Sequence, residues 1–133
     1  MQSNKTSYYF LILAILSLLL GMFFGLFSGV QYIVPDFLKE NLSFSQLREL
    51  HVSLVVGWII MAATGGVYYY IGKEAEGNLA KPRLQKVHLI LFAFTGHAIF
   101  ISLFTNNMGG REYMSFPPFL YFPIILGWVL FAI

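Results

Sequence analysis

The stretch that decides the fold is Phe44-Ser-Gln-Leu-Arg-Glu-Leu-His-Val-Ser-Leu-Val-Val-Gly-Trp58, in which a polar beginning leads into an apolar run. Residues three apart in an α-helix are neighbours on its surface, so Arg48 and His51 are expected to share one face. The stretch therefore predicts a helix that enters an apolar environment. A basic side chain and an imidazole lie in its first two turns, which we call the mouth of the helix.

The composition indicates that this environment is a lipid bilayer. Of the 133 residues, 58% are hydrophobic, 18% are aromatic and 11% are charged, whereas average soluble domains contain about 25% charged residues. The net charge of +2 makes no basic patch, and the absence of cysteine excludes the usual zinc spacings. Nucleic-acid binding therefore has little support.

Four apolar runs without charged residues predict the architecture. A helix needs about 20 apolar residues to cross a bilayer. In lipid the backbone must satisfy its own hydrogen bonds, which favours helices over the alternating pattern of a barrel. The chain is predicted to be an all-α integral membrane protein with one transmembrane domain, residues 1–133. The helices are expected at about residues 8–34, 44–72, 84–104 and 116–133.

The charges of the loops predict the orientation. If the helices alternate in direction, five basic residues lie on the side of the amino terminus and three on the opposite side. Basic residues are enriched in cytoplasmic loops, so the amino terminus is placed in the cytoplasm. The five are Lys5, Lys73, Lys81, Arg83 and Lys86, and the three are Lys39, Arg48 and Arg111.

This orientation places Arg48, His51, Arg111 and Glu112 together at the outer membrane face, where they can build one site. A neutral imidazole at this depth can bind a haem iron, and arginines nearer the water can pair with haem propionates. The pattern is typical of a membrane cytochrome.

Two smaller motifs concern the helices themselves. Gly21, Gly25 and Gly29 recur at spacing four and make a flat stripe, which we interpret as a surface for close helix packing. Ser43 and Gln46 have the spacing of a capping box and mark the start of the second helix.

Several segments, spread in order over nearly the whole chain, form a specific combination. They include an Arg-x-x-His helix mouth, a Tyr-Tyr helix end and a Gly-Arg-Glu loop. Together they resemble the amino-terminal part of the large haem b subunit of cytochrome c-dependent nitric oxide reductases, in the haem-copper oxidase superfamily. The segments are Gly25-Leu-Phe-Ser-Gly-Val-Gln-Tyr32, Asp36-Phe-Leu38, Leu47-Arg-Glu-Leu-His51, Trp58, Gly65-Gly-Val-Tyr-Tyr69 and Gly110-Arg-Glu-Tyr113.

The resemblance implies a role for each residue of the site. His51 corresponds to one of two axial ligands of a low-spin haem b, and Arg48 and Arg111 to neighbours of its propionates. Glu112 matches a carboxylate that ligates a calcium ion between propionates. Calcium takes six to eight oxygen ligands, so propionates, water or another subunit would have to complete that site.

The resemblance also implies what lies outside this sequence. The family's catalytic centre and the second axial ligand belong to later helices, so the chain is expected to be part of an oxidoreductase without catalytic residues of its own. The expected partners are the remaining subunit I helices, on another chain or in a missing carboxyl-terminal part, membrane lipid, and a cytochrome c subunit or soluble cytochrome c. The expected location is the bacterial cytoplasmic membrane, with the haem near its outer face. Nitric oxide and oxygen both remain open as acceptors.

Two other hypotheses compete with this one. A stand-alone four-helix membrane cytochrome b would bind one haem between His51 and His97, but His97 lies about seven residues, on the order of 10 Å, below the outer end of its helix. A small exporter would need an acidic residue inside the membrane, and none of the four uncharged apolar runs, residues 8–34, 50–71, 87–104 and 116–133, contains one. His88 is expected at the cytoplasmic interface.

Overall fold

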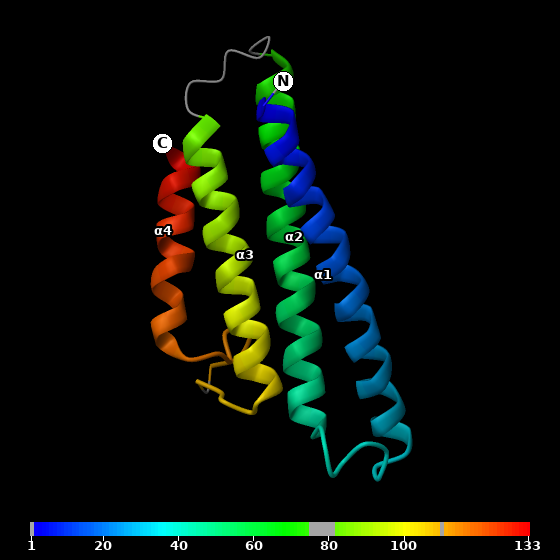
Figure 1. The fold of residues 1–133 in the computed structure, drawn as a ribbon. Helices are drawn as coiled ribbons and strands as arrows, with labels where there is room; N and C mark the ends of the chain where they lie inside the picture. The colour runs from blue at the N-terminus through cyan, green and yellow to red at the C-terminus, as the bar shows by residue number, and fades with distance from the viewer. Residues whose placement is uncertain (1, 75–81, 110) are drawn as a thin grey trace.

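A computed structural model describes residues 2–74, 82–109 and 111–133 and confirms the all-α fold (Figure 1). Three long helices are followed by a short 3-10 turn and a shorter helix. They are α1 (Gln2–Ile33), α2 (Phe44–Glu74), α3 (Pro82–Phe104), η1 (Pro118–Leu120) and α4 (Tyr121–Ala132).

The first three helices are long and apolar enough to cross a membrane. Of the most apolar window in each, only 28%, 17% and 28% is buried within the chain. Most of this apolar surface therefore faces outward, which suits contact with lipid or with other helices. The fourth span is represented by the 12 residues of α4, because the preceding segment forms a loop and η1 where a helix from residue 116 was expected.

The helices lie side by side in the order α1, α2, α3, α4, and the described ends of the chain lie at the same end of the bundle (Figure 1). Helix α1 packs mainly on α2, and α3 packs mainly on α4. Helices α1 and α3 finish, and α2 begins, at the opposite end, which we call the lower end as it is drawn in Figure 1.

Glycines allow α1 and α2 to approach closely. A Cβ atom at Gly21 would lie 3.1 Å from Cγ2 of Val55, and one at Gly65 would lie 3.0 Å from Cβ of Phe10. The predicted close packing on the glycine stripe is thus confirmed at Gly21. At Gly29 it stays a prediction, because no atom of the described residues lies within 4 Å of the Cβ position.

Serine hydroxyls of α1 tie the same two helices together. Ser7 donates a 2.7 Å hydrogen bond to the carbonyl oxygen of Gly65, and Ser17 donates one of 2.7 Å to that of Leu54. Hydrogen bonds between helices satisfy polar groups that lipid cannot solvate.

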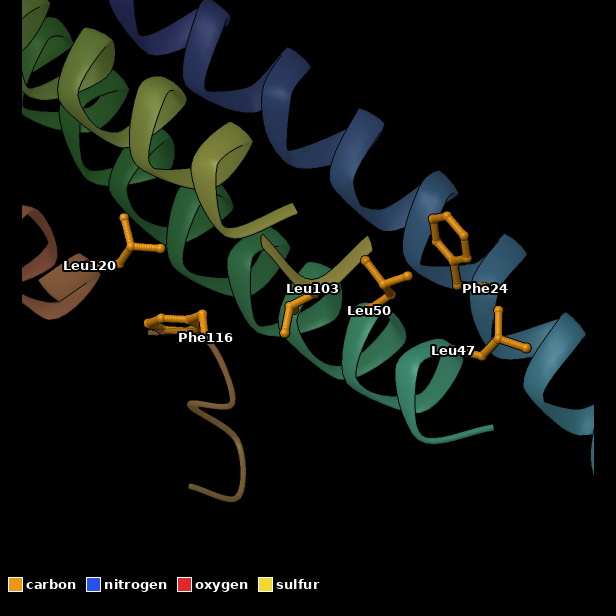
Figure 2. Close-up of a cluster of buried hydrophobic side chains, with 6 residues drawn as sticks. All are labelled: Phe24, Leu47, Leu50, Leu103, Phe116 and Leu120. Atoms are coloured by element: carbon orange, nitrogen blue, oxygen red, sulfur yellow. The ribbon is translucent and has the colours of Figure 1, made fainter. Parts of the chain in front are cut away.

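A buried apolar cluster joins all parts of the lower end (Figure 2). It draws on three helices and on the segment that leads into α4. Its members are Phe24 of α1, Leu47 and Leu50 of α2, Leu103 of α3, and Phe116 and Leu120. Because Leu47 and Leu50 flank Arg48 and Glu49, the cluster fixes the first turns of α2 against the 105–117 loop.

The predicted capping box at the start of α2 is confirmed. The backbone N–H of Gln46 donates to Ser43 Oγ at 3.3 Å, and the N–H of Ser43 donates to Gln46 Oε1 at 3.0 Å. The Gln46 side chain also donates to the carbonyl oxygen of Phe104 at 3.3 Å. One residue therefore caps α2 and ties its beginning to the end of α3.

His88, which was expected at an interface, lies inside the bundle near its upper end. Its side chain is fully buried, and Nδ1 lies 2.8 Å from the hydroxyl of Tyr68. Phe10, Phe92 and Phe131 pack around the two rings. This pair was not predicted, because its members are 20 positions apart in the sequence.

Gly65 and Gly66 provide a matched test of the helix packing. We expect Gly65→Val to destabilise the bundle by about 1 to 3 kcal/mol, because the new side chain would overpack Phe10 and Leu11. Gly66→Val should have little effect, because nothing lies within 4 Å of its Cβ position. Thermal unfolding of the two variants in the same detergent measures the difference, and equal midpoints would contradict the packing described here.

Candidate functional site

His51 lies in the second turn of α2 and points toward α1. Its Nδ1 atom is 2.7 Å from the carbonyl oxygen of Gly21. A carbonyl oxygen only accepts hydrogen bonds, so Nδ1 carries the hydrogen and the free lone pair of the ring is on Nε2. A histidine that binds a metal almost always donates its other ring N–H to such an acceptor. The hydrogen bond thus fixes a tautomer in which Nε2 is the nitrogen that can bind a metal or accept a hydrogen bond.

The glycine stripe of α1 provides the space for this ring. A Cβ atom at Gly25 would lie 2.6 Å from Nδ1 and 2.8 Å from Cε1 of His51, so any side chain there would displace the imidazole. The interpretation of the stripe as a packing surface alone was incomplete. Gly21 supplies the acceptor and Gly25 supplies the room, while Gly29, one turn further, leaves open space.

Arg48 pairs with a residue that the sequence analysis missed. Its Nη2 atom lies 2.6 Å from Oε1 of Glu49, and the two side chains are 52% and 7% exposed. A guanidinium carries five N–H donors, so Arg48 can hold Glu49 and still donate to a second acidic group. The signal for Glu49 was present in the sequence, because a carboxylate at the mouth of an apolar helix needs a partner.

The loop between α3 and η1 packs on the same turn of α2. Ser115 Oγ donates to Oε2 of Glu49 and lies 3.1 Å from the carbonyl oxygen of Arg111. The chain turns back between Arg111 and Met114, with Tyr113 in the left-handed region at a φ of 63°. The structure thus brings the loop and the mouth of α2 together at the lower end.

The two charged side chains predicted from this loop both face outward. Arg111 and Glu112 are both exposed. In the part of the chain that the structure describes, no cluster of three or more His, Cys, Asp or Glu residues could hold a metal ion. Gly110 of the Gly-Arg-Glu motif lies outside the described residues.

His97 lies in different surroundings from His51. Its side chain is exposed, and Nδ1 lies 2.8 Å from the carbonyl oxygen of Ala93, one turn earlier in α3. It lines a cavity of about 260 Å³ together with Leu16 and Phe100, and His51 does not contribute to that cavity. The contacts of the two imidazoles therefore do not converge on one site.

The role of Gly25 can be tested on the chain itself. Gly25→Ala should break the hydrogen bond between His51 and Gly21, because the methyl group would overlap the imidazole. Gly29→Ala, on the same stripe, should leave it intact. The ¹⁵N spectrum of histidine-labelled chain in detergent reports the tautomer of His51. An Nδ1–H signal that persists in Gly25→Ala would show that the ring does not depend on this glycine.

Comparisons with known proteins show the family to which the chain belongs. The sequence model of one family, described as cytochrome C and Quinol oxidase polypeptide I, matches residues 5–133. A nitric oxide reductase subunit of Stutzerimonas stutzeri is 32% identical over 95 residues, a match that covers 71% of this chain and 20% of that protein. The resemblance that the motifs indicated is therefore confirmed, and the match spans about a fifth of the relative's length. The chain belongs to the cytochrome c and quinol oxidase polypeptide I family, as an all-α, membrane-integral member.

Proposed function

We propose that His51 is an axial ligand of a low-spin haem b in a respiratory complex of the nitric oxide reductase or cytochrome c oxidase type. The observation that supports this most is the hydrogen bond from His51 Nδ1 to the Gly21 carbonyl, which leaves Nε2 as the ring atom for iron. When bound, the haem supplies one-electron transfer. The residues of this chain bind and orient it.

Each side chain near His51 then has a distinct task. The Gly21 carbonyl accepts the Nδ1–H and makes the imidazole a more basic ligand. Gly25 keeps the surface of α1 flat, so that the ring stands between the two helices. Arg48, about one turn nearer the beginning of α2, offers its remaining N–H groups to the propionates. Arg111 is exposed at the same end of the bundle and adds a second cation.

The charges of the four side chains that we assign to the haem site are compatible with a role for calcium. Arg48 and Arg111 are balanced by Glu49 and Glu112, so these four side chains carry no net charge. The two propionates of a haem would leave a net charge of −2, which one divalent cation neutralises. Glu112, exposed in the loop that packs on the first turns of α2, is the carboxylate that we assign to this cation, with oxygen atoms from outside this chain completing the shell.

The remaining parts of the complex follow from the family. We place the catalytic centre and the second axial ligand on helices outside this sequence, and the largely exposed apolar faces of α1, α2 and α3 suit contact with such helices. The loop charges put the amino terminus in the cytoplasm and the haem near the outer face of a bacterial cytoplasmic membrane. There a cytochrome c can deliver electrons. The named relative favours nitric oxide as the acceptor.

The ligand role is tested by removing the imidazole in the assembled complex. His51→Ala should abolish the absorption bands of low-spin haem b, because no other side chain replaces the missing bond to iron. His97→Ala should leave them unchanged. Haem b content per complex, measured by the pyridine haemochrome method, checks both. An unchanged spectrum in His51→Ala would contradict the ligand role, and loss of haem in His97→Ala would revive the stand-alone cytochrome.

The calcium assignment has its own test. Glu112→Gln should lower the calcium content per complex, because one charged ligand is removed. Inductively coupled plasma mass spectrometry after dialysis measures this content. Glu40→Gln removes an exposed carboxylate from the loop between α1 and α2 and serves as the control. Equal calcium in both variants and in the wild type would exclude Glu112 as a ligand.

A further inference from the structure

We propose that Glu49 is a positioning residue of the haem site, acting through Arg48. It holds the Arg48 guanidinium on the side of α2 next to His51 and ties the 111–115 turn to the same helix. This inference rests on the proposed haem function and deepens it.

The contacts of Glu49 account for both of its carboxylate oxygens. Oε1 accepts from Arg48 Nη2, and Oε2 accepts from Ser115 Oγ. The residue is 6% exposed and lies between Leu47 and Leu50, two members of the buried cluster at the lower end. A buried carboxylate with a charged partner and a hydroxyl partner is fixed in place. Loss of the charged partner would leave a desolvated charge unpaired, and loss of the hydroxyl would leave one carboxylate oxygen without its hydrogen bond.

The geometry of α2 links this carboxylate to the haem ligand. Successive residues of an α-helix are about 100° apart, so Arg48 lies about 60° from His51, and Glu49 lies about 160° from His51 in the same direction. Arg48 thus lies between the two. The bond to Glu49 holds a long side chain that is half exposed and would otherwise sample many rotamers.

The turn on the other side of Glu49 is itself well defined. The backbone N–H of Gly109 donates to the carbonyl oxygen of Ser115, and a Cβ atom at Gly109 would collide with the carbonyl oxygen of Phe116. The Tyr121 hydroxyl donates to the carbonyl oxygen of Met114 at 2.9 Å. Ser115 therefore presents its hydroxyl from a braced turn, and Glu49 connects that turn to Arg48.

A positioning role differs from two simpler roles in what it predicts. If Glu49 acted only as a nearby negative charge, its removal would shift the midpoint potential of the haem whether or not Arg48 were present. If it only stabilised the fold, its removal would lower the amount of complex and leave the potential unchanged. If it acts through Arg48, the shift must depend on Arg48.

A double-mutant cycle in the assembled complex separates these roles. The midpoint potential of low-spin haem b is measured at one pH and ionic strength for the wild type, Arg48→Gln, Glu49→Gln and the double variant. We expect Glu49→Gln to shift the potential and the same substitution to have little further effect in the Arg48→Gln background. Glu40→Gln, the control for charge at this end, should leave the potential at the wild-type value.

The opposite results are equally clear. Equal shifts by Glu49→Gln in both backgrounds, or no shift in either, would overturn the positioning role. If Glu49→Gln fails to assemble, Ser115→Ala takes its place in the cycle, because it removes one of the two partners that fix the Glu49 carboxylate without changing any charge. A shift of the potential that disappears in the Arg48→Gln background would support the positioning role, and equal shifts in both backgrounds, or none, would overturn it. Haem that depends on His51 but ignores Glu49 would refute this inference alone, whereas haem that survives His51→Ala would refute the proposed function with it.

Discussion

The hydrogen bond from His51 to the carbonyl oxygen of Gly21 is the interaction on which the site depends. It joins α1 to α2 at the level of the imidazole and decides which ring nitrogen is free. Such a bond needs helices that approach closely, and the absence of a side chain at Gly21 and at Gly25 of α1 allows this approach. The tautomer of His51 therefore depends on the close packing of α1 on α2.

Near this contact, the buried charge of Glu49 is paired. Its carboxylate pairs with Arg48 in the first turns of α2 and accepts a hydrogen bond from Ser115, which lies in the loop between α3 and η1. A buried apolar cluster beneath them holds the helix and the loop in register. At the upper end, the hydroxyl of Tyr68 and Nδ1 of His88 pair within a group of aromatic rings.

The sequence was sufficient for the parts of the fold that follow from hydrophobicity and local spacing. The apolar runs identified the helices, and Ser43 and Gln46 identified the start of α2. The contacts that the sequence did not reveal are long-range: 66 residues separate Ser115 from Glu49, and 30 separate His51 from Gly21. Spacing along one helix could not show that Gly25 faces an imidazole, nor that a loop hydroxyl needs Glu49. Helix spacing and loop charges located Arg48, His51, Arg111 and Glu112, and the family resemblance implied their roles, but neither attached a function to their neighbours.

The proposed function depends on a single bond between Nε2 of His51 and porphyrin iron, with Nδ1 still donating to the Gly21 carbonyl oxygen. An experimental density map of the complete membrane assembly would show this bond. We expect a haem whose iron is within bonding distance of Nε2, with its propionates toward Arg48. A map in which the ring faces lipid, or uses Nε2 to bind another protein group with no macrocycle beside it, would exclude this role.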